Sequence, residues 1–258
     1  MTIELVDEVV GAKHDSSPGP DGIPFSVYRA LRDLVSPLLL QLARHAAQPR
    51  KKLNKKFNWV NLFFFPKKKD KLRADQLRPI AVSNTDNRIL ANIVRKIITP
   101  AIEPLLSKVQ HAFMQNASIG DVIKQVNSRF QAALSNKEEL RVFLHDFQKV
   151  YDSISREYMF ELLEKIGLPP PILALLENLF ASVVGLPILL SPNKQKIKMP
   201  QGLLQGSPLS CLLFLLCIDP LLSRLEQREG ISPSAFADDV AIIFDNLGCS
   251  LGPVLADV

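Results

Sequence analysis

The sequence of 258 residues has little cysteine, a single tryptophan and no apolar run long enough to span a membrane. Cys211, Cys217 and Cys249 lack the spacing of a metal site, and so few cysteines are typical of a reducing compartment rather than of a disulfide framework. The longest apolar stretch begins at Leu209 and is soon interrupted by an acid and a proline, whereas a transmembrane helix needs about 20 apolar residues. No signal peptide, internal repeat or low-complexity tract is recognisable. These absences favour a soluble intracellular protein without a membrane partner.

The positive charge is concentrated in one part of the chain. The whole sequence carries 31 Lys and Arg against 26 Asp and Glu, whereas residues 50–100 hold 14 of the cations and 3 of the acids. Aromatic residues such as Phe57 and Trp59 lie between these charges, as in a surface that follows a phosphate backbone. A solvated face is the common alternative for a charge run. The lysines predicted to contact nucleic acid are Lys51, Lys52, Lys55, Lys56, Lys68 and Lys69.

Hydrophobic periodicity predicts helices and one strand in the first part of the chain. Residues 25–46 have helical spacing, with Val27, Leu31 and Leu34 on the apolar side. Residues 58–66 are rich in apolar and aromatic side chains and end in a proline, which predicts a strand.

The predicted elements that follow alternate helices with short strands. In chain order they are a helix over 87–98, a strand over 141–147, helices over 155–167 and 172–180, a hairpin over 186–199, an apolar helix that begins at 207–208 and a hairpin over 232–244. This order predicts an α+β fold with a mainly antiparallel sheet. We place a basic N-terminal part at residues 1–135 and a sheet domain at residues 136–258.

Two adjacent acids, Asp238 and Asp239, interrupt the apolar stretch "SPSAFADDVAIIF". Burying ionised carboxylates is costly unless a cation or a donor offsets their charge, although a solvated turn is the common alternative. Asp146 ends a predicted strand on the same side as Val142 and Leu144, where a core face would open to solvent. If that strand lies beside the hairpin, Asp146 meets Asp238. The carboxylates could then hold Mg²⁺, and two such ions support phosphoryl transfer.

The loop "QGLLQGSPLS" adds a candidate nucleotide contact. Gln205 supplies an amide, and Gly206 allows the backbone to approach a ligand closely. Ser207 and Pro208 are typical of a helix cap and first helical position. A simple helix-start loop explains the serine and proline but does not require Gln-Gly before them.

Five segments carry a resemblance to a known family. In order, they are "SSPGPDGIP", "FFFPKKKD" with "LRPIAVSN", "DFQKVYDS", "QGLLQGSPLSCLLF" and "FADDVAIIF". Together they resemble the reverse transcriptase domain of non-LTR (LINE-type) retrotransposons, from about residue 16 to residue 244. The resemblance implies a right-hand polymerase fold. Its N-terminal extension and basic fingers would occupy 1–135, and its palm, an antiparallel sheet flanked by helices, 136–258.

The resemblance also implies roles for individual residues. Asp146, Asp238 and Asp239 match the family's metal-binding and catalytic aspartates, which would hold two Mg²⁺ ions, with Mn²⁺ as an alternative. The residues that would bind the incoming nucleotide are Lys67, Arg78, Tyr151, Gln205 and Gly206. Lys67 and Arg78 would grip the triphosphate, Tyr151 would lie under the sugar and exclude a 2′-hydroxyl, and the "PGPDG" turn would help to hold the template.

The implied partners are an RNA template, a DNA primer and dNTPs, and the implied reaction is nucleotide transfer to the primer 3′-hydroxyl at a nuclear site. The chain ends at Val258, soon after the second acidic hairpin. On this resemblance we expect a C-terminally truncated domain without a thumb, with the thumb or an endonuclease on another polypeptide.

Three other interpretations stay open at this point. A catalytically inactive remnant would bind nucleic acid through its basic part alone. A group II intron maturase shares the aspartates and the Gln-Gly loop. An RNase H-like nuclease also uses clustered acids, but offers no reason for "LLQGSPLS" or for the basic segment.

Overall fold

The computed structural model describes residues 1–11, 16–67, 76–113, 118–137, 139–147, 149–188 and 195–244. The chain divides into two compact units, each made of two stretches. The first unit comprises 1–98 with 151–210, and the second comprises 99–150 with 211–258. The predicted boundary at residue 135, between the basic fingers and the palm, is a division by function and stays a prediction. No helix in the described part of the chain is long and apolar enough to cross a membrane.

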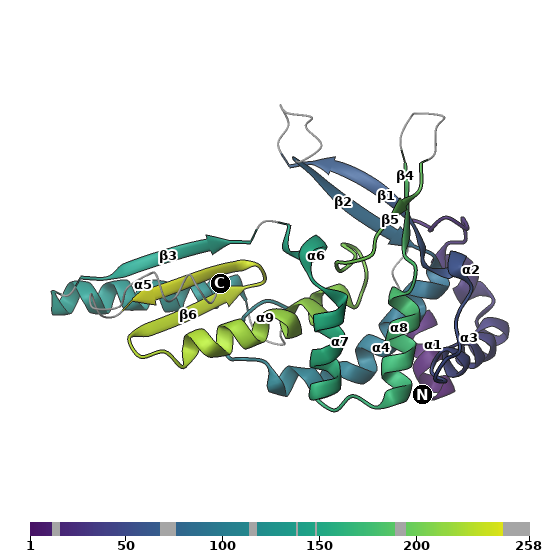
Figure 1. The fold of residues 1–258 in the computed structure, drawn as a ribbon, viewed down its shortest axis with the longest axis horizontal. Coiled ribbons are helices and arrows are strands. Elements are labelled where there is room, and N and C mark those ends of the chain that lie inside the picture. The colour runs from purple at the N-terminus through teal and green to yellow at the C-terminus, as the bar shows by residue number, and fades with distance from the viewer. Residues whose placement is uncertain are drawn as a thin grey trace. The chain divides into compact units, whose positions relative to one another are not determined.

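The first unit packs helices beneath a four-stranded sheet (Figure 1). Its helices are α1 (Ile3–Gly11), α2 (Phe25–Ala30), α3 (Arg32–Ala46), the 3₁₀ helix η1 (Lys55–Asn58), α4 (Thr85–Ile102, whose last turn belongs to the second unit), α6 (Val150–Ser153), α7 (Arg156–Lys165) and α8 (Pro170–Phe180). The helices predicted over 87–98, 155–167 and 172–180 are therefore present. Ser155 caps α7 as its sequence suggests, since its hydroxyl accepts the N–H of Tyr158 at 3.2 Å.

The apolar stripe predicted for residues 25–46 is wrong. The chain breaks between α2 and α3 at Leu31, so the two helices do not share one periodicity. Val27, Leu31 and Leu34 are exposed, whereas α3 packs through a different stripe that includes Leu39 and Ala43. Because of this break, α2 and α3 turn different sides toward the core. A single helical period applied across residues 25–46 cannot predict such a change.

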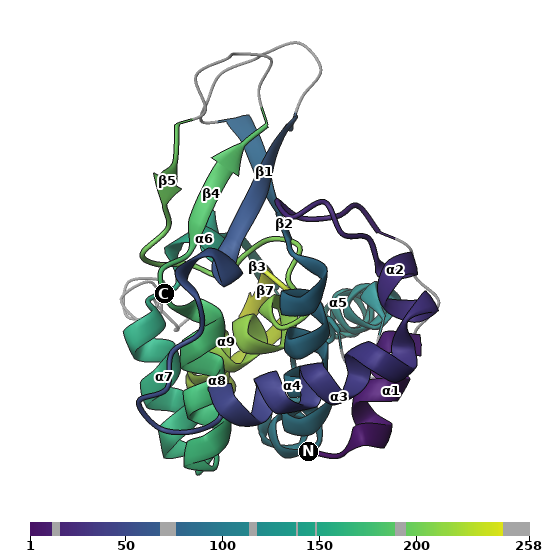
Figure 2. The ribbon, with the colours of Figure 1, turned by 90° about the vertical axis from the view of Figure 1, so that its right-hand side faces the viewer.

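The sheet of the first unit has the strand order β2-β1-β4-β5 (Figure 2). The strands are β1 (Trp59–Pro66), β2 (Leu77–Ser83), β4 (Val184–Pro187) and β5 (Ile197–Lys198). β1 pairs antiparallel with β2 but parallel with β4, so this sheet is mixed rather than antiparallel throughout. One face packs into a core of Val60, Leu62, Ala81, Val183 and Leu204.

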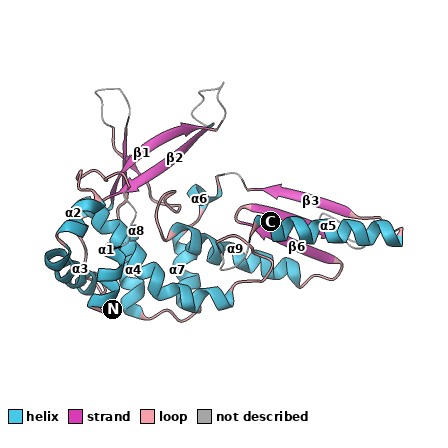
Figure 3. Cartoon of the chain, turned by 180° about the vertical axis from the view of Figure 1, so that it is seen from behind, coloured by secondary structure: helices cyan, strands magenta, loops and turns pink. Residues whose placement is uncertain are grey.

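The second unit contains a three-stranded antiparallel sheet of order β3-β7-β6 (Figure 3). Its elements are the 3₁₀ helix η3 (Glu103–Leu105), α5 (Ile119–Asn136), β3 (Arg141–Asp146), α9 (Ser210–Glu226), β6 (Ile231–Phe236) and β7 (Asp239–Phe244). The predicted strand over 141–147 and the hairpin over 232–244 are confirmed. One sheet face is core, with Ala235, Val240 and Ile242 all buried. α5, which packs against β6, is not among the elements predicted from the sequence.

Candidate functional site

The three predicted acids lie together at one end of the second unit's sheet. Asp146 is the last residue of β3 and stands directly opposite Asp239, the first residue of β7. Asp238 occupies the two-residue turn that joins β6 to β7. Directly opposite residues of an antiparallel pair project from the same face, so Asp146 and Asp239 share one face of the sheet.

The charges of these acids act on one another. Partial burial raises the pKa of Asp239, and the negative charges of Asp238 and Asp146 raise that pKa further. Asp239 therefore lies close enough to Asp238 and to Asp146 for repulsion, which a cation would relieve. In the described ranges no group of three or more His, Cys, Asp or Glu is arranged to hold a metal ion by itself. The donor set nevertheless fits Mg²⁺, which commonly takes one or two carboxylates and fills its other positions with water and phosphate oxygens.

A groove of about 520 Å³ runs beside the acids, between the sheet and α5. Its lining includes Asp146, Asp239 and Phe236 from the sheet and mostly apolar residues such as Ile123 and Phe130 from α5. Leu144, which we expected on a core face beside Asp146, is 76% exposed and lines this groove. The face that carries the acids is therefore open at Leu144 of β3, whereas Ala241 and Ile243 of β7 on the same face are buried.

The predicted nucleotide residues belong to the first unit. Tyr151, in α6, is fixed to the loop that carries Gln205, because its carbonyl accepts the N–H of Leu203 at 2.7 Å. The same loop touches α6 at Gly202, where an added Cβ would lie 2.7 Å from the carbonyl oxygen of Asp152. The backbone of α6, which contains Tyr151, is thus packed directly against the loop that contains Gln205.

A buried arginine, which sequence analysis missed, holds the start of this loop. Arg156 donates from Nε to the carbonyl of Gly202 at 3.1 Å and from Nη1 to the carbonyl of Phe180 at 3.0 Å. A third, longer contact of 3.4 Å joins Nη2 to the carbonyl of Gln201. Burial lowers the pKa of Arg156. No sequence pattern signals this role, because the three acceptors are backbone atoms brought together by the fold.

The Gln205–Gly206 segment docks on the free edge of β2. The carbonyl of Gln205 accepts the N–H of Ala81 at 2.8 Å. Gly206 has a φ of +111°, and a Cβ there would lie 2.6 Å from the oxygen of Ala81. The close backbone approach that Gly206 allows is therefore made, in this structure, to Ala81 of β2. α9 begins at Ser210, later than the predicted 207–208, and the Ser207 hydroxyl accepts the N–H of Leu209 at 3.4 Å.

Lys67 and Arg78 lie on one face of the β1–β2 ribbon. Arg78 stands opposite Phe65, and the N–H of Lys67 continues the ladder by donating to the carbonyl of Gln76 at 2.9 Å. Alternation then places Lys67 and Arg78 on the same side, together with Ile80, whose side chain lies near Gly206. Both cations are exposed. The predicted contacts at Lys68 and Lys69 lie outside the described residues.

The "PGPDG" turn packs on the end of β2. A Cβ at Gly19 would lie 2.4 Å from the backbone nitrogen of Asn84, so only glycine fits there. The N–H of Asp21 donates to Oδ1 of Asn84 at 3.2 Å. β2 therefore carries Arg78 and also contacts both the "PGPDG" turn and the Gln205–Gly206 segment.

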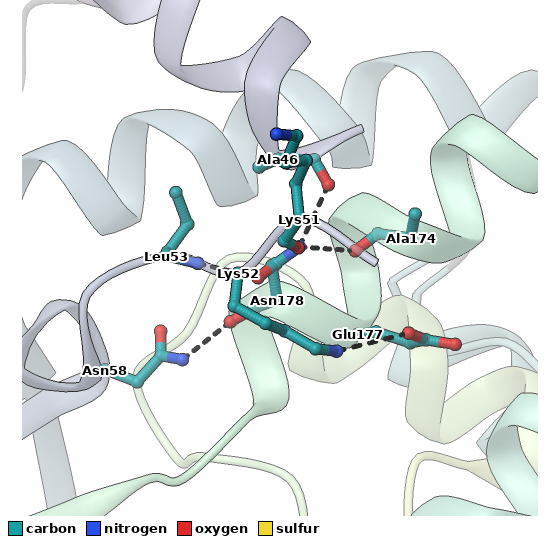
Figure 4. A network of polar contacts seen from close by, with 8 residues as sticks. All are labelled: Ala46, Lys51, Lys52, Leu53, Asn58, Ala174, Glu177 and Asn178. Atoms are coloured by element: carbon teal, nitrogen blue, oxygen red, sulfur yellow. Dashed lines mark hydrogen bonds and ion pairs between the residues drawn. The ribbon is translucent and has the colours of Figure 1, made fainter. Parts of the chain in front are cut away.

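The basic segment is held in place by Asn178 of α8 (Figure 4). Its Oδ1 accepts the N–H of Leu53 at 3.0 Å, and its Nδ2 donates to the carbonyls of Ala46 and Lys51, both at 2.9 Å. The side chains of Lys51, Lys52, Lys55 and Lys56 stay exposed on this segment.

The exposed lysines of this segment differ in their partners. Lys52 forms a 3.7 Å ion pair with Glu177. Lys56 lies over the Trp59 ring at 5.6 Å from its centroid, and Lys196, which sequence analysis missed, lies over the same ring at 4.5 Å.

Comparison with known proteins supplies the family. Residues 65–257 match the model of the family described as reverse transcriptase (RNA-dependent DNA polymerase). The chain is 23% identical over 244 residues to the transposon TX1 uncharacterized 149 kDa protein of Xenopus laevis, covering 91% of this chain and 19% of that protein. It is 22% identical over 249 residues to a Pol polyprotein of the type-1 retrotransposable element R2 of Nasonia vitripennis, covering 92% of this chain and 23% of the polyprotein.

The fold is similar to that of solved telomerases. The apo telomerase of Candida tropicalis matches with a TM-score of 0.57 at 13% identity, over 84% of this chain and 44% of that one. A C-terminally truncated form of that enzyme matches with a TM-score of 0.56 at 14% identity, over 94% of this chain and 53% of the other. These likenesses agree with the predicted fingers-and-palm architecture.

The chain spans about a fifth to a third of the length of the curated relatives it matches. The family model covers most of the chain, including the hairpin with Asp238 and Asp239 and the loop with Gln205. The chain therefore belongs to the reverse transcriptase family, in the lineage of RNA-directed DNA polymerases and with non-LTR retrotransposon proteins as its relatives, as its five ordered motifs predict.

Proposed function

We propose that this chain is the part of a non-LTR retrotransposon polyprotein that copies RNA into DNA, by adding dNTPs to the 3′-hydroxyl of a DNA primer. The observation that carries this proposal is the cross-strand pair of Asp146 and Asp239 with Asp238 beside it. The repulsion of Asp239 by Asp238 and by Asp146 favours a divalent cation over a solvated turn.

Asp146, Asp238 and Asp239 would hold the two Mg²⁺ or Mn²⁺ ions. When bound, such ions activate an attacking oxygen and stabilise a leaving one. The chain's own contribution is to fix the carboxylates on a rigid sheet, with Asp146 and Asp239 in direct register. The groove along α5 gives the open space beside them that a primer end requires.

The first unit would bind the incoming nucleotide. Lys67 and Arg78 share one exposed face, and an ammonium with a guanidinium suits the phosphates of a dNTP. Tyr151 would limit the space at the sugar and so select against a 2′-hydroxyl. Gln205 and Gly206 would lie along the nucleotide, with the packing of the loop on β2 fixing their position.

RNA is the proposed template. One structural neighbour, the telomerase of Candida albicans, was solved in complex with a fragment of telomeric RNA and has a TM-score of 0.52 to this chain. Lys51, Lys55, Lys56 and the "PGPDG" turn are the proposed template contacts, because the lysines are exposed cations and Lys56 adjoins an aromatic ring. A nuclear site of action stays a prediction.

Primer extension with the parent chain tests this function. A labelled DNA primer is annealed to RNA and, separately, to DNA of the same sequence, with dNTPs or NTPs and with or without Mg²⁺. We expect dNTP incorporation on RNA that stops when the metal is chelated. A chain that binds RNA with a steep salt dependence yet incorporates nothing under any condition would instead be an inactive remnant.

A further inference from the structure

The segment before α5 forms an outer edge of the second unit's sheet. The N–H of Ala235 donates to the carbonyl of Val109 at 2.8 Å, and the N–H of His111 donates to the carbonyl of Ala235 at 2.9 Å. These bonds make an isolated parallel bridge between Gln110 and Ala235. Gln110 therefore sits beside the strand that leads into the acidic turn.

The Gln110 side chain binds both peptide groups of Ala237, the residue that precedes the two acids. Its Oε1 accepts the N–H of Ala237 at 3.0 Å, and its Nε2 donates to the carbonyl of Ala237 at 3.3 Å. Oε1 also accepts the N–H of Ala112 at 2.9 Å. Gln110 is only 3% exposed, so water cannot readily replace these bonds.

Ala237 adopts a backbone conformation that needs support. Its φ is +57°, in the left-handed region that residues with a Cβ seldom occupy. The N–H belongs to the peptide before Ala237 and the carbonyl to the peptide after it. Holding both fixes the two peptide planes, and so fixes the direction in which Asp238 leaves the strand.

We infer that Gln110 is a positioning residue for the acidic pair, acting through the Ala237 turn. This inference rests on the proposed function and extends it, because Gln110 touches neither metal nor substrate in the proposed scheme. The amide is suited to the task, since it offers a donor and an acceptor to one residue at the same time. The alternative is a buried amide that stabilises the unit as a whole without any local effect on the acids.

Gln110→Met separates these two possibilities. Methionine has a similar length and volume but neither donates nor accepts such hydrogen bonds. Packing therefore survives, while the two hydrogen bonds between Gln110 and Ala237, here called the clamp, are lost. Gln125→Met is the matched control. Gln125 lies on α5, and its Oε1 accepts the hydroxyl of Ser234 at 3.0 Å, so it binds the same strand β6 away from the turn.

Three measurements on the parent and the two variants test the inference. They are the rate of nucleotide addition, the Mg²⁺ concentration at half-maximal rate, and amide hydrogen exchange of the peptide that contains Ala237. For Gln110→Met we expect at least a tenfold slower rate, at least a threefold higher Mg²⁺ requirement and at least tenfold faster exchange. Gln125→Met should stay within twofold of the parent in all three. A Gln110→Met variant that matches the parent would overturn the inference.

Hydrogen exchange keeps this test separate from that of the proposed function. A parent chain that incorporates nothing contradicts the function, and the exchange of the Ala237 peptide then decides the clamp alone. Should Gln110→Met not fold, Gln110→Asn keeps an uncharged amide but is one methylene shorter, so it cannot keep both bonds to Ala237. Faster exchange at the turn with a native melting temperature would then support the clamp, and unchanged exchange would refute it.

Discussion

Single buried polar residues fix much of the geometry around this site. Asp86, half-buried next to the first residue of α4, carries a cost. Burial raises the pKa of Asp86 to about 6, against the effect of the Asn87 N–H that its carboxylate accepts at 2.6 Å, and the charge of Asp21 adds to the rise. The ionised form is therefore less favourable in the folded chain than in the unfolded one.

Asp86→Asn is expected to change the pH dependence of stability. Because the folded pKa lies above the unfolded value of 3.8, the contribution of this group falls as pH rises from about 4 to about 6 and stays low above that. The variant keeps an oxygen for the Asn87 N–H but has no charge. We expect it to be about 1–3 kcal/mol more stable than the parent at pH 7.5 and nearly equal at pH 4, in denaturant titrations. An equal difference at both pH values would refute this.

Arg156→Lys tests the support of the nucleotide loop. A lysine ammonium cannot reach three carbonyls in the planar arrangement of a guanidinium, so at least one buried acceptor loses its partner. We expect a loss of about 1–3 kcal/mol in unfolding free energy. Arg32→Lys, at an exposed 3.8 Å ion pair with Asp7, is the control and should change stability by less than about 0.5 kcal/mol.

At the scale of elements, β2 is the piece on which the first unit's predicted site is assembled. It pairs with β1 along one edge and accepts the Gln205–Gly206 segment along the other. Its last residues also meet the turn that contains Gly19. Three sequence motifs far apart in the chain thus depend on one short strand.

Gly206→Ala is expected to disturb this assembly. The new Cβ would combine a strained φ of +111° with a 2.6 Å contact to a backbone oxygen that cannot move aside. We expect a loss of about 2–4 kcal/mol, since each effect alone costs about 1–3 kcal/mol. At Gly22 the φ is +74° and an added Cβ would have no atom within 4 Å, so Gly22→Ala isolates the conformational effect. We expect it to lower the unfolding free energy by about 1–2 kcal/mol, and thermal melts of both variants measure the two losses. Equal losses would mean that the contact with Ala81 is unimportant.

The sequence predicts elements whose pattern is local and fails where partners are distant. The acidic hairpin and the strand with Asp146 follow from alternation and turn residues. Their pairing is only a condition of the predicted metal site, which brings Asp146 to Asp238, whereas in the structure Asp146 stands opposite Asp239. The parallel pairing of β1 with β4 has no local signal, because it joins segments about 125 residues apart. The same holds for Gln110, Arg156 and Asn178, whose polar side chains bind backbone atoms that only the fold brings near.

At the scale of the whole molecule, the basic residues and the acidic residues of the proposed site lie in different parts of the chain. The acids belong to the second unit, whereas the exposed lysines of the basic segment and the predicted nucleotide residues belong to the first. The family match extends through both units. Substitution of these lysines should therefore weaken nucleic-acid binding, and substitution of the acids should slow nucleotide addition.

The double variant Lys51→Glu, Lys55→Glu tests the binding part. For single-stranded RNA, each lost phosphate contact should reduce the slope of log affinity against log salt by about 0.7. We expect a shallower slope by about 1.4 in filter binding, and weaker binding at low salt. Lys165→Glu with Lys108→Glu makes the same charge change at other exposed positions and should leave the slope within about 0.3. The same slope in both double variants would argue against a specific basic surface.

The central claim is that Asp146 and its neighbours Asp238 and Asp239 support nucleotide addition, and its most direct test is single-nucleotide incorporation by Asp146→Asn. The assay compares this variant with the parent and with Asp33→Asn, an exposed acid in the first turn of α3. We predict at least a thousandfold slower incorporation for Asp146→Asn, about 4 kcal/mol in activation free energy, with RNA binding unchanged and Asp33→Asn equal to the parent. Incorporation by folded Asp146→Asn at the parent's rate would contradict the account.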